Sequence, residues 1–153
     1  MSIAFRAGAV VLGCVALLGF QDASTLSFQE FDPISFQHSS GGSELKHLPE
    51  TMGSGVALLD IDNDGRLDIF FVNAANEKHR LLRNMGNWRF VDITEKWGVG
   101  RDGYGMGAAV GDFNNDGRAD LYLTSVGRNR LYRNTGTKFV DVTETAGVAA
   151  SGW

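Results

Sequence analysis

The feature that most constrains this chain of 153 residues is a unit of about 50 residues that is written twice. Four blocks recur in the same order: Gly55–Asp60 at Gly107–Asp112, Asp60–Asp68 (DIDNDGRLD) at Asp112–Asp120 (DFNNDGRAD), Arg80–Asn84 (RLLRN) at Arg130–Asn134 (RLYRN), and Phe90–Val99 (FVDITEKWGV) at Phe139–Val148 (FVDVTETAGV). The offset is 52 residues for the first two blocks, then 50, then 49. The length changes therefore fall between blocks, as expected where surface loops join the elements of a structural repeat.

Each unit is predicted to form four short strands. In the first unit we expect them at Val56–Leu59, Leu67–Val72, Arg80–Arg83 and Arg89–Ile93, which are rich in apolar, β-branched and aromatic residues. The run Ile69–Val72 is apolar without alternation, which is typical of a strand buried on both faces. Four strands at this period are typical of a β-propeller blade. The predicted fold class is all-β, with about two complete blades of an incomplete propeller; a β-sandwich is the alternative.

Composition supports this interpretation and excludes other classes. Glycine contributes 20 residues and proline 2, which favours many tight turns. The net charge of −4 argues against a nucleic-acid-binding domain. The single cysteine, Cys14, excludes both an intramolecular disulfide and a cysteine-ligated zinc site.

The most specific motif is an aspartate-rich loop between the first two strands of each unit. The first loop places carboxylates at loop positions 1, 3, 5 and 9, a glycine at position 6 (Gly65), and a backbone carbonyl at position 7. The candidate metal ligands are Asp60, Asp62, Asp64, Arg66 through its carbonyl, and Asp68; in the second loop they are Asp112, Asn114, Asp116, Arg118 through its carbonyl, and Asp120. All are oxygens, which selects a hard cation, Ca²⁺ before Mg²⁺ or Mn²⁺.

Two alternatives to a strand-flanked calcium site can be weighed from the sequence. An EF-hand needs a bidentate glutamate at position 12, where this chain has Phe71 and Leu123, and helices on both sides, so it is rejected. The other alternative is a solvated turn without metal. The presence of the aspartate-rich loop at equivalent positions of both repeats argues against it. If calcium binds, we expect a structural role, because a loop that cages its ion leaves no open position for catalysis. Asn63 and Asn115 fall between ligand positions and are not counted.

These residues resemble a known family. The pattern D-x-D-x-D-G-x-x-D, preceded by G-x-G (Gly53–Gly55 and Gly105–Gly107), resembles the FG-GAP/VCBS repeat of integrin α-subunit propellers. Leu48–Gly65, followed by RLLRN and F-V-D-I-T-E-x-x-G-V, is similar to the bacterial ASPIC/UnbV (cartilage acidic protein-like) group. The resemblance covers about Ser27 to Trp153 and implies a secreted or surface calcium-binding propeller, commonly without catalysis. Full members carry several loops and a further C-terminal domain, and a role carried by that domain does not transfer to this chain.

The amino-terminal segment is predicted to direct export. Ala7–Phe20 is a run of 14 residues without charge after Arg6, which is short for a membrane span and typical of a secretory signal. A buried helix, an uncleaved anchor and a lipoprotein modified at Cys14 are the alternatives. The expected organisation is a signal or anchor at 1–23, a lead-in at 24–54 with a strand of a preceding blade at Phe28–Phe31, and one repeat at 55–104. A second repeat is expected at 105–153, truncated into the start of a third.

Candidates for catalysis are few. His38, His47 and His79 lie in no metal-ligand spacing, and we interpret them as surface or packing residues. Trp88, Trp97 and Trp153 are expected to pack in the core rather than to line a binding face.

Two classes of function are compatible with the sequence. The first is a non-enzymatic, calcium-stabilised binding or adhesion module with a protein or glycan ligand, no nucleic acid, and membrane contact only through its amino-terminal segment. The alternative is part of an exported enzyme or biosynthetic accessory protein. A closed propeller needs at least four blades, so the chain is expected to be a fragment or to associate with itself.

Overall fold

The computed structural model describes residues 34–45, 47–74, 77–100 and 103–152. The chain divides into two units, Met1–Ser35 and Phe36–Trp153, and the second contains the two repeats. The predicted signal segment Ala7–Phe20, the predicted strand Phe28–Phe31 and Trp153 lie outside the described residues. Within the described ranges, no helix has the length and apolar character needed to cross a membrane.

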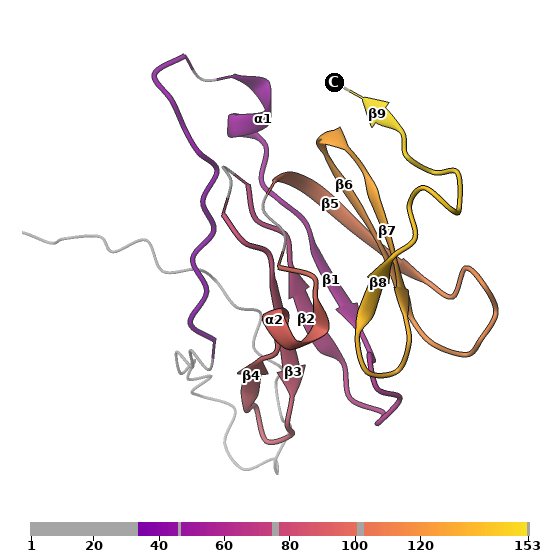
Figure 1. Cartoon of the computed structure of the whole chain (residues 1–153). Coiled ribbons are helices and arrows are strands. Elements are labelled where there is room, and N and C mark those ends of the chain that lie inside the picture. Colours follow the sequence, from indigo (N-terminus) through magenta and orange to yellow (C-terminus); the bar gives the residue numbers. More distant parts are fainter. Residues whose placement is uncertain (1–33, 46, 75–76, 101–102, 153) are drawn as a thin grey trace, which may run out of the picture. The chain divides into compact units, whose positions relative to one another are not determined.

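Two antiparallel four-stranded meanders form the second unit (Figure 1). The first blade contains β1 (Val56–Leu59), β2 (Asp68–Phe71), β3 (Arg80–Asn84) and β4 (Phe90–Asp92). The second contains β5 (Tyr104–Gly111), β6 (Asp120–Arg128), β7 (Arg130–Asn134) and β8 (Phe139–Asp141), and β9 (Ser151–Gly152) pairs with the end of β6. The all-β class and the two four-stranded units predicted from the sequence are confirmed.

The two blades share one register. Leu59 pairs with Asp68 in the first blade, and Gly111 pairs with Asp120 at the equivalent place in the second. The residue before loop position 1 therefore pairs with position 9 in each blade, which brings the two ends of the loop together.

One-turn helices and a hairpin account for the differences from the expected elements. α1 (Leu48–Thr51) precedes β1, and α2 (Thr94–Trp97) follows β4 and ends at Gly98, whose φ of 73° is the left-handed conformation favoured by glycine. Between β3 and β4 the hairpin carries one more residue than its counterpart, and both Asn87 and Trp88 have positive φ. Trp88 is therefore 55% exposed, contrary to the packing expected from the sequence, whereas Trp97 is buried as expected.

The core lies between the two blades and is built from one face of each. We call the first the Leu59 face, formed by Ala57, Leu59, Phe70 and Leu81 of the first blade. The second is the Leu121 face, formed by Ala108, Leu121, Leu123 and Tyr132 of the second blade. The expectation that β2 is buried on both faces is wrong in part, because Ile69 and Phe71 are only half-buried.

The two G-x-G motifs are where the blades approach most closely. The Gly55 N–H donates to the Met106 carbonyl at 3.0 Å, and the Ser54 hydroxyl donates to the Gly105 carbonyl at 3.0 Å. A β-carbon on Gly55 would lie 2.9 Å from the Gly107 Cα, so a side chain there would push the inner strands apart. Gly55 thus permits close contact between the two blades.

Candidate metal centre

The loop between β1 and β2 is shaped by its own carboxylates. Asp60 accepts hydrogen bonds from the backbone N–H groups of Asp64 (3.0 Å) and Gly65 (2.8 Å), which fold the loop back on its first residue. Asp68 accepts from the Ile61 N–H (3.0 Å) and the Asn84 N–H (2.7 Å), which fixes the end of the loop to β3. Gly65 has a φ of 81°, as its place in the sharp turn predicts.

The second loop repeats these contacts almost atom for atom. Asp112 accepts from the N–H groups of Asp116 (3.0 Å) and Gly117 (2.7 Å). Asp120 accepts from the N–H groups of Phe113 (3.1 Å) and Asn134 (2.7 Å). The sequence repeat is therefore a repeat of loop conformation and not only of composition.

Three carboxylates of the first loop converge. One oxygen from each of Asp60, Asp62 and Asp68 lies within 4.8 Å of the others. The Asp62 Oδ1 is buried and has no hydrogen-bond partner, although a buried carboxylate oxygen without a partner is costly. A cation bound among the three would supply that partner and offset the repulsion between like charges. The donor set consists only of oxygens and fits calcium.

Burial makes Asp68 the most constrained of the three carboxylates. Desolvation raises its pKa above the usual value, and the neighbouring charges of Asp62 and Asp64 act in the same direction, while hydrogen bonds from Asn84 and Ile61 oppose them. The ionised form of Asp68 is thus strained without a counter-charge, and a cation would relieve that strain.

An arginine that the sequence analysis did not single out completes the first loop. Arg83 of β3 forms ion pairs with Asp62 and, at 3.5 Å, with Asp64, while the Arg66 side chain pairs with Asp64 and donates to the Asn84 carbonyl at 3.0 Å. Asp64 therefore faces arginines rather than the three gathered carboxylates. The sequence contains this arginine in the R-N ending that RLLRN and RLYRN share. Its place beside the loop, however, depends on the pairing of β2 with β3, which the sequence does not specify.

The second loop carries less charge and more exposure. Asn114 replaces the acidic residue at position 3 and donates its side-chain amide to Asp116 at 2.9 Å, and Arg118 donates to the same carboxylate at 2.6 Å. The hydrogen bond from Asn114 lowers the pKa of Asp116 and outweighs desolvation, with Arg118 adding to the effect. Among the described residues, the three gathered carboxylates belong to the first loop. For the second loop, and for the carbonyls of Arg66 and Arg118, metal binding stays a prediction.

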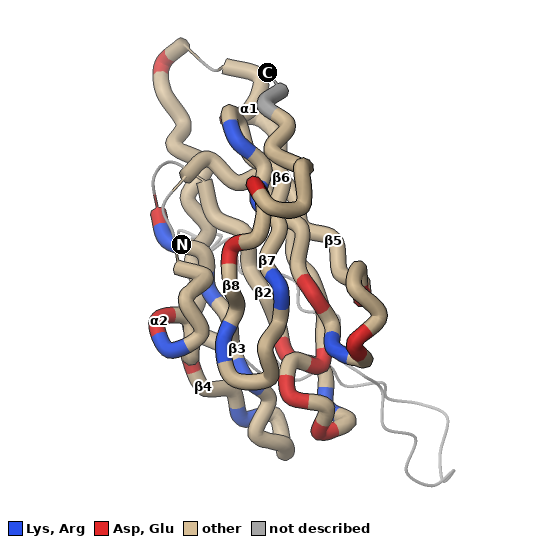
Figure 2. The backbone as a smooth tube through the Cα atoms, turned by 45° about the vertical axis from the view of Figure 1, so that its right-hand side comes forward, with Lys and Arg blue, Asp and Glu red and all other residues tan. Residues whose placement is uncertain are grey.

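The two loops contact each other. The Asn63 side-chain amide donates to the Gly117 carbonyl at 3.1 Å, and the Asn134 side-chain amide donates to the Ile61 carbonyl at 2.8 Å. Figure 2 shows the acidic segments of both loops toward the same end of the sheets. One hydrogen bond thus links the first loop to the second, and another links the first loop to the end of β7.

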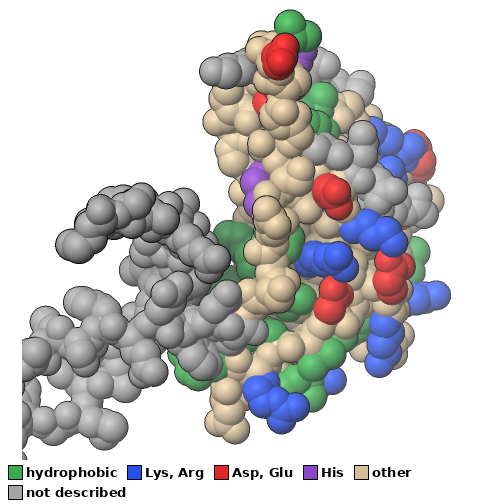
Figure 3. All heavy atoms as spheres, turned by 90° about the vertical axis from the view of Figure 1, so that its left-hand side faces the viewer, with side chains coloured by type: hydrophobic (Ala, Val, Ile, Leu, Met, Phe, Trp, Pro, Cys, Tyr) green, Lys and Arg blue, Asp and Glu red, His purple; other side chains and the backbone are tan. Residues whose placement is uncertain are grey.

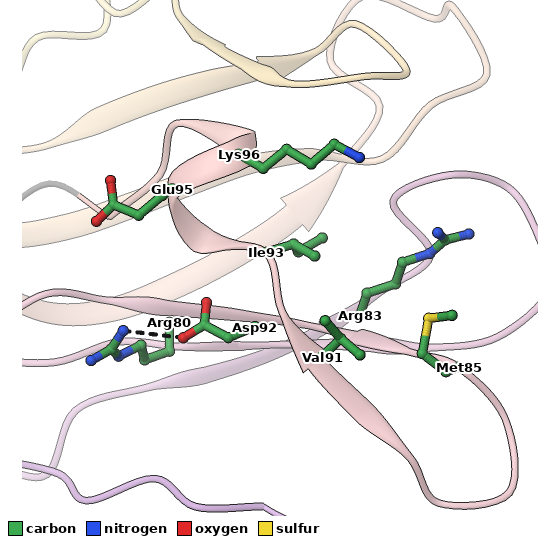
Figure 4. Close-up of a pocket in the computed structure, with 8 residues that line it drawn as sticks. All are labelled: Arg80, Arg83, Met85, Val91, Asp92, Ile93, Glu95 and Lys96. Atoms are coloured by element: carbon green, nitrogen blue, oxygen red, sulfur yellow. Dashed lines mark hydrogen bonds and ion pairs between the residues drawn. The ribbon is translucent and has the colours of Figure 1, made fainter.

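Two other candidates do not form a catalytic arrangement. His38 and His47 are exposed, and His79 is buried against Phe70 with its Nδ1 accepting the Asn73 N–H at 3.0 Å, so the interpretation of the histidines as surface or packing residues holds. A shallow cleft of about 630 Å³ lies beside β4 and α2 (Figure 4). Its charged groups are largely engaged: Arg80 pairs with Asp92 at 3.1 Å, Glu95 pairs with Lys78 at 2.6 Å, and Arg83 pairs with the first loop.

Comparisons with known proteins agree with this geometry. Residues 60–123 match the model of the FG-GAP-like repeat family. Cartilage acidic protein 1 of Xenopus tropicalis is 38% identical over 102 residues, which cover 65% of this chain and 16% of that protein. The Mus musculus protein of the same name is 32% identical over 127 residues, which cover 77% of this chain and 20% of that protein. The Homo sapiens protein is 37% identical over 89 residues, which cover 57% of this chain and 13% of that protein.

The chain thus spans a fifth or less of the length of these relatives. The matched segment contains both aspartate-rich loops and the strands between them. The resemblance drawn from the loops and from the G-x-G, RLLRN and FVDIT blocks is confirmed.

Proposed function

We propose that this chain, which carries FG-GAP-like repeats, is an exported module stabilised by calcium. In this proposal it binds another macromolecule and catalyses no reaction. The observation that carries the proposal is the convergence of Asp60, Asp62 and Asp68 around the buried, unpartnered Asp62 Oδ1. The first loop would hold calcium through these three carboxylates. Bound calcium would supply the positive charge that lets them remain ionised side by side.

A non-enzymatic role is supported by the way the polar groups are used. The loop carboxylates accept hydrogen bonds from backbone N–H groups and so shape the turns. The buried histidine, His79, accepts a backbone hydrogen bond and packs in the interior. The similarity to FG-GAP-like repeats and to cartilage acidic protein 1 fits a binding or adhesion module.

A protein or glycan ligand is favoured over nucleic acid. The net charge is −4, and Figure 3 shows basic and acidic side chains interspersed over the described part of the face it displays. Export is proposed from the uncharged run Ala7–Phe20 and from the family resemblance. A reporter fused after Ser27 should leave the cytoplasm, and deleting Ala7–Phe20 should retain it there.

Calorimetric titration with Ca²⁺ tests the metal assignment. We expect a stoichiometry near two and tighter binding at the first loop, because higher ligand charge tightens calcium. Exchanging position 3 between the loops, with Asp62→Asn and Asn114→Asp together, should reverse the order of the two sites. Glu77→Gln, which changes an exposed acid outside both loops, is the control and should leave both unchanged. Absence of any calcium binding by the folded protein would remove the proposal.

A further inference from the structure

The two blades bury opposite faces of the same repeat. On β1 the side chains of Ala57 and Leu59 are buried, whereas their counterparts on β5, Ala109 and Gly111, are exposed. On β2 Phe70 is buried and Ile69 is half-buried, and on β6 the pattern is inverted, with Leu121 buried and Tyr122 half-buried. The blades therefore pack front to back, each repeat placing its Leu121-type face on the Leu59-type face of the repeat before it.

An ion pair present in both blades also differs in exposure between them. Arg80 pairs with Asp92 in the first blade, and Arg130 pairs with Asp141 at the equivalent positions of the second. The side chains of the first pair are 46% and 44% exposed, and those of the second are 25% and 23% exposed. The same residues are thus covered in one blade and uncovered in the other.

This arrangement leaves two faces without a partner blade in the described part of the chain. The first, which we call the Leu58 face, comprises Val56, Leu58, Ile69 and Phe71 and is the counterpart of the Leu121 face. Val56 and Leu58 are each 57% exposed, and Phe36 stacks on Phe71 at a ring-centroid distance of 4.3 Å. The second, the Tyr122 face, comprises Ala109, Gly111, Tyr122 and Leu131 and is the counterpart of the Leu59 face. Ala109 and Gly111 are exposed and Tyr122 is half-buried, whereas Leu131 is already buried.

We propose that the Leu58 face of one copy of this chain packs on the Tyr122 face of a second copy. The two faces are the repeat counterparts of the two faces that already pack together inside the chain, so the new contact continues an existing interface in the same register. Exposed apolar side chains on β1, including Val56 and Leu58, would be removed from water.

Such a contact is heterologous, because two different surfaces meet. A heterologous contact repeats from copy to copy and either closes into a ring or continues as an open chain. Propellers close at about four to eight blades, which corresponds to about two to four copies of the two blades that the described residues form. Ring closure would also remove the uncovered sheet faces. The proposal does not depend on calcium binding.

Sedimentation of the full chain and of two face variants tests the proposal. Leu58→Arg disables one face and Tyr122→Arg disables the other, so each variant alone should be a monomer while the unaltered chain is a multimer. A mixture of the two variants should give a one-to-one dimer and nothing larger, because one intact face of each kind remains. Leu48→Arg changes a leucine that is 59% exposed on α1, outside both faces, and should sediment as the unaltered chain does.

Several outcomes would overturn the proposal. A monomeric unaltered chain would do so, and so would a multimer that persists in either face variant alone. A Tyr122→Arg dimer together with a Leu58→Arg monomer would indicate a symmetric contact instead of a head-to-tail one. Circular dichroism checks that each variant is folded; Val56→Arg and Ala109→Arg, at exposed positions of the same two faces, replace a variant that does not fold.

Discussion

At the scale of single residues, both loops depend on an asparagine in a conformation that most residues avoid. Asn63 and Asn115 each have a φ of 57°, in the left-handed region where asparagine is tolerated better than other side chains. Only Asn63 also donates its side-chain amide across to the other loop, to the Gly117 carbonyl, among the contacts that the described residues make. Comparing substitutions of Asn63 and Asn115 therefore separates the energetic cost of the backbone conformation from that of the contact between the loops.

We expect Asn63→Ala to destabilise the protein more than Asn115→Ala. Both should lose about 1 kcal/mol because alanine is less favourable in the left-handed conformation. Asn63→Ala should lose about 0.5–1.5 kcal/mol more with the hydrogen bond. Chemical denaturation of the two variants measures the difference, and equal losses would contradict a stabilising bond between the loops.

A second residue-scale prediction concerns acid. In each blade a buried threonine accepts a backbone N–H from the third strand and donates its hydroxyl to an aspartate, Thr143 to Asp141 in the second blade. Burial opposes ionisation of Asp141, but hydrogen bonds from Thr143 and the charge of Arg130 outweigh it and lower the pKa below the ordinary 3.8. The ionised group therefore stabilises the fold above its ordinary pKa, and this stabilisation is lost as the pH falls through the lowered value.

The melting temperature of Asp141→Asn should accordingly lie below that of the unaltered chain at neutral pH, and the gap should narrow as the medium is acidified below about pH 4. Asp92 has the same partners in the first blade and a lowered pKa, with burial again opposed by Thr94 and Arg80, but its side chain is more exposed. Asp92→Asn should show the same trend with smaller amplitude. A gap that is constant with pH would contradict a stabilising role for the ionised carboxylates.

At the scale of elements, the junction between the blades depends on glycines with no room for a side chain. A β-carbon on Gly105 would lie 2.4 Å from the Val72 Cγ1 and 2.8 Å from both the Asn73 carbonyl oxygen and the His79 Cε1. We expect Gly105→Ala to destabilise the fold by about 1–3 kcal/mol through overpacking. Gly53→Ala, at the counterpart position of the first repeat with nothing within 4 Å, is the matched control and should change the stability little. Similar effects of both would argue against this close packing.

The elements themselves could be predicted from the sequence, because strand period, turn residues and internal repetition all agree. Val56–Leu59 is found as predicted, and the other strands of the first blade differ by one residue at one or both ends. The role of Arg83 beside Asp62 and the exposure of Trp88 could not be predicted. The first depends on which strands pair, and the second on a hairpin with one extra residue whose backbone has positive φ.

At the scale of the whole molecule, the two blades are joined through a shared core and through two contacting loops. The core contains residues of both blades, and Asn134 of β7 donates to the carbonyl of Ile61 between two ligand candidates of the first loop. Losing a cation from the first loop should therefore weaken the whole two-blade unit, and not only the loop. A ligand that binds only the folded state stabilises it by about 2.7 kcal/mol at a hundredfold excess over its dissociation constant.

Thermal unfolding with calcium and with chelator decides whether calcium stabilises the two-blade unit. We predict a higher melting temperature in calcium for the unaltered chain, and a single transition because both blades share one core. The calcium-dependent increase should shrink in Asp62→Ala, which removes the oxygen without a hydrogen-bond partner, and should be kept in Glu77→Gln. A melting temperature that chelator leaves unchanged would contradict a structural role for calcium, even if calcium still bound.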